Sequence, residues 1–193
     1  MLITFTASSF LCLFCVYLCI VKKQELIPYI EKGLISERKH PNADLWIYNY
    51  TPVVQYDRLW DAITKSCRGL IMDGAGNVIA RPFSKFFNLQ EHQPSEIPNE
   101  PFDVYEKMDG SLGIIYWIGN TPYIATRGSF ESEQSIHATN VLHTRYAHLF
   151  NKLNRKYTYL VEILYPENRI VIKDWMIYAY WLLWIPQQVM TFL

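Results

Sequence analysis

Short hydrophobic runs that alternate with polar residues recur along most of the chain, and turn-forming residues separate them. A two-residue period is typical of strands that bury one face and expose the other. The pattern predicts strands at residues 45–50, 69–72, 78–80, 104–107, 113–118, 123–126, 159–164 and 169–172. The stretch 73–77, which is rich in Asp, Gly and Asn, and the pair Gly119-Asn120 predict hairpin turns.

Three segments show helical rather than strand-like spacing. Residues 25–34 predict a short helix that ends at Gly33. Because proline fits only the first turn of a helix, Pro28 limits the start of this helix to the neighbourhood of residue 28. Residues 56–65 place three apolar side chains on one helical face. Ser132 can cap a third helix. Its apolar face includes Leu142, Tyr146, Leu149, Phe150 and Leu153.

The order of these elements predicts the fold class. Strands dominate, hairpins are frequent, and no regular alternation of strand, helix and parallel strand occurs. We therefore expect an α+β protein with antiparallel sheets and flanking helices.

The two ends of the chain differ from the middle. Residues 2–21 carry no charge and are followed by Lys22 and Lys23. Twenty such residues can span a bilayer core of roughly 30 Å, and lysines after the segment would leave the next domain in the cytosol. The alternatives are a wrongly chosen start codon or a buried helix. We divide the chain into an apolar segment at 1–23, a main domain at 24–174 and an aromatic-rich divergent tail at 175–193.

Composition narrows the functional classes. The chain has 193 residues, 50% of them hydrophobic, and a formal net charge of +0, which fits one ordinary domain with a sizeable core. Because the whole chain is neutral, any contact with nucleic acid requires a local cationic patch. Three of the four cysteines lie in the apolar N-terminal segment, so a disulfide framework is not predicted. No spacing of the five histidines suits a zinc site, and we expect them on the surface or in helices.

Lys107 is the most informative candidate for chemistry. It stands in the tract Lys107-Met108-Asp109-Gly110, before the apolar run 112–118. This places an amine at a strand boundary, beside a glycine that lets a phosphate come close. Further tracts lie on both sides, and their order along the chain is informative. They are Cys67-Arg68-Gly69, Lys85-Phe86-Phe87-Asn88, Thr126-Arg127-Gly128 and Val161-Glu162-Ile163.

In this order the tracts resemble the N-terminal adenylyltransferase domain of the phage T4 RNA ligase 1 family, a class of ATP-dependent RNA ligases. The similarity runs from about residue 25 to residue 172 and includes Tyr48-Asn49-Tyr50. It implies a covalent nucleotidyltransferase (ATP-grasp-like) ligase fold in which Lys107 becomes adenylylated. It also implies two later motifs, a glutamate and a pair of lysines, which this chain lacks, so we expect the domain to be C-terminally incomplete. The implied nucleotide site comprises Tyr48, Arg68, Lys85, Phe87, Gly110, Arg127 and Glu162.

The chemistry expected of these residues follows from their charges. A lysine attacks phosphorus only as the free amine, and its ordinary pKa is about 10.4. Neighbouring cations lower that pKa, and Arg68, Lys85 and Arg127 supply them. The same cations would neutralise a triphosphate and the charge that develops during transfer.

Several residues keep a structural alternative. Tyr48 and Phe87 can be packed core aromatics instead of nucleotide contacts. Glu162 can form a buried pair with a lysine or with Arg169. Asp109 can orient Lys107 or end the strand instead of binding metal, and the ligands of a metal ion stay unknown.

The leading hypothesis is an ATP-dependent RNA ligase with ATP and Mg²⁺ as cofactors. It would form lysyl-AMP at Lys107, pass AMP to an RNA 5′-phosphate and seal the strand with a 3′-hydroxyl, as in tRNA repair in the cytoplasm. An end-healing kinase or phosphatase would be its partner. One alternative is a truncated, weak or inactive fragment that binds ATP or RNA. Another is a membrane-anchored interaction protein that faces the cytosol.

Overall fold

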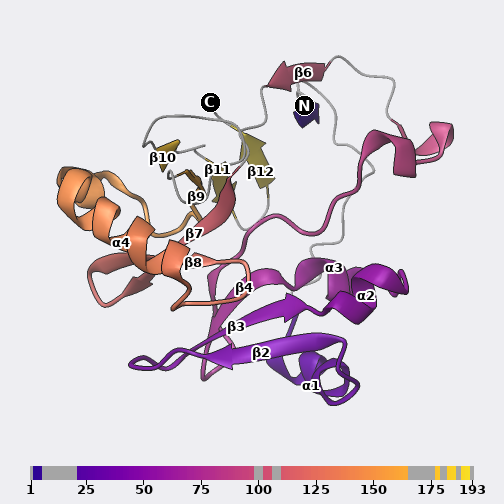
Figure 1. Cartoon of the computed structure of the whole chain (residues 1–193), viewed down its shortest axis with the longest axis horizontal. Helices are drawn as coiled ribbons and strands as arrows, with labels where there is room; N and C mark the ends of the chain where they lie inside the picture. Colours follow the sequence, from indigo (N-terminus) through magenta and orange to yellow (C-terminus); the bar gives the residue numbers. More distant parts are fainter. Residues whose placement is uncertain are drawn as a thin grey trace.

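Two four-stranded antiparallel sheets form the body of the molecule (Figure 1). The computed structural model describes residues 2–5, 21–97, 102–105, 110–164, 177–178, 182–185 and 188–191. The first sheet has the order β2-β3-β4-β5 and comprises β2 (Ile35–Lys39), β3 (Leu45–Tyr50), β4 (Arg68–Asp73) and β5 (Val78–Ala80). The second has the order β10-β9-β7-β8 and comprises β7 (Ser111–Ile118), β8 (Thr121–Thr126), β9 (Leu160–Ile163) and β10 (Ile177–Tyr178).

Hydrophobic clusters on the faces of the sheets join them into layers. Helix α1 (Lys23–Glu31) covers the outer face of the first sheet, where Leu26 packs with Tyr48 and Met72. The inner faces of the two sheets pack on each other through residues such as Ile47 and Ile114. Helix α4 (Glu133–Arg145) covers the outer face of the second sheet. The resulting order is helix, sheet, sheet, helix, and it confirms the predicted α+β class with antiparallel sheets.

Two smaller antiparallel pairs complete the described strands. Strand β1 (Leu2–Phe5) pairs with β6 (Phe102–Tyr105), and β11 (Leu182–Ile185) pairs with β12 (Gln188–Thr191). The start of the apolar N-terminal stretch is therefore a strand. No helix within the described residues has both the length and the hydrophobicity needed to cross a bilayer. The strand predicted at 169–172 lies outside the described residues.

The two N-terminal helix predictions need correction. Helix α1 begins at Lys23, and Pro28 lies inside it instead of starting it. The predicted helix at 56–65 is instead two short helices, α2 (Pro52–Tyr56) and α3 (Ala62–Ser66). Arg58 interrupts them with a φ of 53°, a backbone conformation that cannot continue a helix. The Asp61 carboxylate then caps α3 by accepting from Thr64 N at 2.7 Å.

The third helix prediction is correct at its start. Ser132 Oγ accepts from Ser135 N at 3.2 Å and caps α4, as expected. The helix ends at Arg145, and of the remaining apolar positions Leu149 and Phe150 fall in the 3₁₀ helix η3 (Ala147–Lys152), with Tyr146 and Leu153 directly before and after it.

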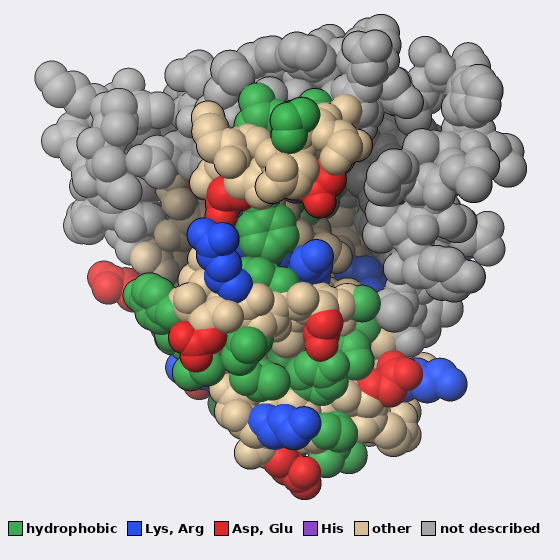
Figure 2. Space-filling view, turned by 90° about the vertical axis from the view of Figure 1, so that its right-hand side faces the viewer, with side chains coloured by type: hydrophobic (Ala, Val, Ile, Leu, Met, Phe, Trp, Pro, Cys, Tyr) green, Lys and Arg blue, Asp and Glu red, His purple; other side chains and the backbone are tan. Residues whose placement is uncertain are grey.

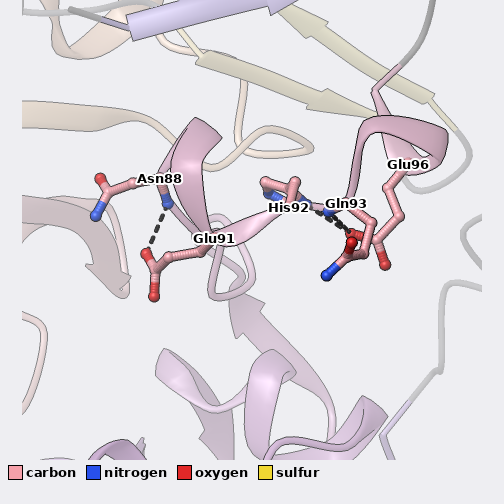
Figure 3. A network of polar contacts seen from close by, with 5 residues as sticks. All are labelled: Asn88, Glu91, His92, Gln93 and Glu96. Carbon is pink, nitrogen blue, oxygen red and sulfur yellow. Dashed lines mark hydrogen bonds and ion pairs between the residues drawn. The ribbon is translucent and has the colours of Figure 1, made fainter.

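Two 3₁₀ turns, η1 (Leu89–Glu91) and η2 (Pro94–Glu96), follow the aromatic pair after β5 (Figure 3). The carboxylate of Glu91 accepts from Asn88 N at 2.9 Å, and that of Glu96 accepts from Gln93 N at 3.0 Å. His92 Nδ1 lies 3.3 Å from Glu96 Oε2. In each turn, the backbone N–H of the preceding residue is thus hydrogen-bonded to a carboxylate of the same turn.

Candidate active site

Gly69 determines how closely the two sheets approach at the candidate site. It has a φ of +88°, in the left-handed region that favours glycine. A Cβ atom there would lie 2.5 Å from Ile114 Cδ1 and 3.2 Å from the carbonyl oxygen of Arg127. The absence of a side chain therefore lets the start of β4, which carries Arg68, lie against the loop after β8, which carries Arg127.

Tyr50, at the end of β3, links the two arginines. Arg127 Nη1 donates to the Tyr50 hydroxyl at 3.0 Å, and the Arg127 guanidinium carbon is 5.1 Å from the centre of the tyrosine ring. Arg68 interacts electrostatically with the same tyrosine. The ring of Tyr50 packs edge-on against Trp60 with 4.8 Å between centroids. The hydroxyl that accepts from Arg127 and interacts with Arg68 is thus held by a buried ring.

Two cations of this cluster, Arg68 and Lys85, have a lowered pKa. Burial lowers the pKa of Arg68, and the nearby charge of Arg127 acts in the same direction, while Tyr50 and Glu162 act against it. An arginine stays protonated nevertheless. Burial also lowers the pKa of Lys85, and Arg68 and Arg127 contribute to that decrease, whereas Glu91 opposes it. Like charges this close cost free energy, which a bound anion would relieve.

Aromatic side chains surround the third cation. Lys85 Nζ lies 4.9 Å from the centre of the Phe87 ring and 5.7 Å from that of Trp60. Its backbone N–H donates to Lys65 O at 2.8 Å, which fixes the segment beside α3. Phe86 is 50% exposed and lies under Arg68, with 5.2 Å between the guanidinium carbon and the ring centre.

Figure 2 views the molecule from the side of α2 and α3 and shows where charged and hydrophobic side chains lie on this face. Lys and Arg side chains line a hollow around hydrophobic side chains, and acidic side chains border it.

Glu162 and Gly110 meet at the other end of the cluster. Gly110 N donates to Glu162 Oε1 at 3.0 Å. A Cβ on Gly110 would lie 2.5 Å from Ile163 O, so glycine is needed for β7 and β9 to pack here. Glu162 also interacts electrostatically with Arg68. The last residue of the Lys-x-Asp-Gly tract is therefore held beside a carboxylate that faces the cationic cluster.

Two predicted site residues and one alternative partner are not placed. Lys107, Asp109 and Arg169 lie outside the described residues.

Tyr48 lies apart from this cluster. Its side chain is fully buried beneath α1, and its hydroxyl donates to Glu37 Oε1 at 2.8 Å. Burial and this hydrogen bond both raise the pKa of Tyr48. The structure thus favours the packed-aromatic interpretation of Tyr48, and Tyr50 takes the place beside the arginines. The pairing of β3 with β4 shifts between Tyr48 and Asn49, and such an irregularity re-aims the following side chains.

Sequence alone did not indicate Tyr50, Trp60 or Phe86 as site residues. The signal for two of them was a position near a predicted residue: Tyr50 ends the Tyr-Asn-Tyr stretch, and Phe86 precedes Phe87. Trp60 carried no such signal.

The described residues suit a nucleotide phosphate better than a metal ion held by protein ligands. Three cations with aromatic neighbours fit a triphosphate and a base. The described ranges contain no group of three or more His, Cys, Asp or Glu side chains that could hold a metal.

A family comparison decides the relationship. A sequence profile described as RNA ligase, of the T4 RNA ligase 1 type, matches residues 66–182. The chain belongs to this RNA ligase family. The match contains Arg68, Lys85, Arg127 and Glu162, and it continues past residue 172, into the stretch that we set apart as a divergent tail.

Two curated relatives agree with this membership of the RNA ligase family. An RNA ligase of Rhodothermus phage RM378 is 26% identical over 184 residues, which cover 74% of this chain and 40% of the phage protein. A protein of Autographa californica nuclear polyhedrosis virus, named as a bifunctional polynucleotide kinase/RNA ligase, is 32% identical over 115 residues. That match covers 53% of this chain and 16% of the viral protein. The chain therefore spans less than half the length of both relatives.

Proposed function

We propose that this chain carries out the nucleotidyl-transfer chemistry of an ATP-dependent RNA ligase. The free amine of Lys107 attacks the α-phosphorus of ATP and loses a proton. A nitrogen–phosphorus bond forms, the bond between the α-phosphorus and the bridging oxygen breaks, and pyrophosphate leaves. The AMP then moves to an RNA 5′-phosphate, and a 3′-hydroxyl displaces it to seal the strand.

The observation that carries the proposal is the cluster in which Arg68 and Arg127 interact with Tyr50 and Lys85 interacts with both arginines. These cations can neutralise the triphosphate and stabilise the charge on the leaving pyrophosphate. They also supply the positive field that an amine needs in order to lose its proton near neutral pH.

The Lys-x-Asp-Gly tract has a short tether to this cluster. Lys107 precedes Gly110 by three residues, which is at most about 11 Å of extended chain. Gly110 in turn is bonded to Glu162, which interacts with Arg68. We assign Arg68 and Arg127 to the phosphates, Glu162 to a hydroxyl of the ribose, and Phe86 or Phe87 to the adenine. Mg²⁺ would shield the phosphates when bound.

We further propose RNA with 5′-phosphate and 3′-hydroxyl ends as the substrate, tRNA among them, in the cytoplasm. A separate kinase or phosphatase would prepare those ends. The name of the baculovirus relative, which combines polynucleotide kinase with RNA ligase, supports such a pairing.

Incubation with Mg²⁺ and α-labelled ATP tests the proposal. We expect label on the chain and none on Lys107→Ala. Lys152→Ala, which removes a surface lysine, should retain it. Arg68→Ala and Arg127→Ala should label about 100-fold more slowly, because each loses a donor to the transition state. Label that persists in Lys107→Ala would contradict the proposal. ATP binding without any label in the unmodified chain would instead support a nucleotide-binding fragment.

A further inference from the structure

A cavity of about 430 Å³ lies beside the arginine cluster, where β2, β3 and α2 meet the loop that carries Arg127. Among the described residues, its lining includes Arg38 and Arg127 and no acidic side chain. The whole chain has equal numbers of basic and acidic residues, 18 of each. Two arginines without a carboxylate are therefore a local excess of positive charge, which selects for an anionic ligand.

The remaining lining suits a nucleotide. Tyr56 and Tyr50 both line the cavity, and Tyr56 is 83% exposed. Asn49, Thr51 and Gln55 add polar groups. Single-stranded RNA is bound by this combination of cations for the phosphates and exposed aromatic rings on which bases stack. A cavity of this volume falls within the range that encloses small ligands.

The position of the cavity suggests which part of the RNA enters it. Arg127 and Tyr50 belong both to the cavity and to the candidate active site, whereas Arg68, Lys85 and Glu162 do not line the cavity. A ligand in the cavity would therefore lie next to the nucleotide phosphates without displacing them. In the proposed reaction, the group that must come this close to the adenylate is the RNA 5′-phosphate.

We propose that the cavity holds the 5′-phosphorylated terminal nucleotide of the RNA that accepts AMP. Its 5′-phosphate lies at Arg127, its base stacks on Tyr56, and Arg38 neutralises the next phosphate of the strand. The identity of this ligand rests on the proposed ligase function, but its binding can be measured without catalysis.

Fluorescence anisotropy with a short 3′-labelled oligoribonucleotide measures this binding directly. We expect the dissociation constant of the 5′-phosphorylated RNA to rise about tenfold in Tyr56→Ala, because base stacking is lost. Tyr56→Phe keeps the ring and should bind as the unmodified chain does. Arg38→Ala should weaken binding, and Arg145→Ala, which removes an exposed arginine at the end of α4, should not. Removing the 5′-phosphate should weaken binding to the unmodified chain.

Labelling with α-labelled ATP in the same variants separates this inference from the proposed function. Tyr56→Ala and Arg38→Ala should acquire AMP at the unmodified rate, since that step needs no RNA. Unchanged RNA affinity in Tyr56→Ala would overturn the inference whatever the labelling shows. Loss of labelling in both variants with intact RNA binding would also overturn it, because the cavity would then hold ATP. RNA binding that depends on Tyr56 in a chain that never acquires label would support the inference and refute the ligase chemistry.

Discussion

At the residue scale, Tyr50 organises the candidate site. The motif tracts indicated Arg68, Lys85, Arg127 and Glu162, and the structure brings these four into one electrostatic cluster. Sequence could indicate them because charged residues at strand ends stand out from apolar runs. It could not distinguish Tyr48 from Tyr50, because the irregular pairing of β3 with β4 leaves no trace in the hydrophobic pattern.

A pair of hydroxyl deletions tests this assignment. Tyr50→Phe keeps the ring against Trp60 but removes the hydroxyl that accepts from Arg127 and interacts with Arg68. We expect self-adenylylation to slow about tenfold, because Arg127 loses the hydrogen bond that positions it in the cluster. Tyr48→Phe is the matched control: it breaks the bond to Glu37 and should lower stability by about 1 kcal/mol without slowing the reaction. Equal rates in the two variants would refute the role of Tyr50.

His40 is a second residue whose environment was not apparent from the sequence. We expected the histidines at the surface or in helices, but His40 is buried, with Nε2 3.1 Å from the Tyr116 hydroxyl and its ring packed edge-on against Phe130. Burial lowers the pKa of His40, although the charge of Glu131 acts in the opposite direction. The folded state thus binds the proton less readily than the unfolded state.

The sign of the pH effect follows. The stability that the neutral ring contributes is complete above the unfolded pKa of about 6.5 and is lost as the pH falls below it. Urea unfolding should show a lower free energy of unfolding at pH 5.5 than at pH 7.5, and His40→Gln should reduce that difference. His148→Gln, at an exposed position, should keep it. A pH dependence that survives His40→Gln unchanged would rule out this histidine as its source.

At the element scale, the strands were more predictable than the helices. Strand β3 has the predicted bounds because its alternation is regular and aromatic. The predicted helix at 56–65 failed because apolar spacing alone does not show that Arg58 leaves the helical conformation and that Asp61 starts a new helix. Asp61 also accepts from the Tyr29 hydroxyl at 2.5 Å and so ties α3 to α1.

Removing that carboxylate should be costly. Asp61→Ala loses the cap of α3 and the bond from Tyr29, so we expect the free energy of unfolding to fall by about 2 kcal/mol. Chemical denaturation measures the change. Asp57→Ala removes an exposed carboxylate nearby and should change stability by less than about 0.5 kcal/mol. Similar losses in the two variants would show that the cap is unimportant.

The glycine at the contact between the sheets gives a second test at this scale. Gly69→Ala adds both left-handed strain and a methyl group against Ile114 and Arg127, so we expect a loss of about 2–4 kcal/mol. Gly33 also has a positive φ, +69°, but no atom lies within 4 Å of a Cβ added there. Gly33→Ala should therefore lower the free energy of unfolding by only about 1 kcal/mol. Both can be measured by guanidinium unfolding. Equal losses would mean that the sheets accommodate the methyl group without strain.

At the scale of the whole molecule, the neutral chain concentrates positive charge where two sheets meet. The balanced composition predicted a local cationic patch, instead of a basic surface field, for any contact with a polyanion. Sequence order also indicated the family, which a profile over residues 66–182 confirms. The meeting of β4, the loop after β8, and β9 could not be predicted from the pattern, because it depends on pairings between distant segments.

The most direct test of the proposed chemistry is to locate the AMP. After incubation with ATP and Mg²⁺, the chain can be digested and its peptides analysed by mass spectrometry. We predict a single adenylylated peptide that contains Lys107, with acid-labile AMP on that lysine, as expected for a phosphoramidate. AMP on a different lysine, or a fully unmodified Lys107 peptide under conditions in which the chain binds ATP, would contradict the nucleotidyl-transfer mechanism.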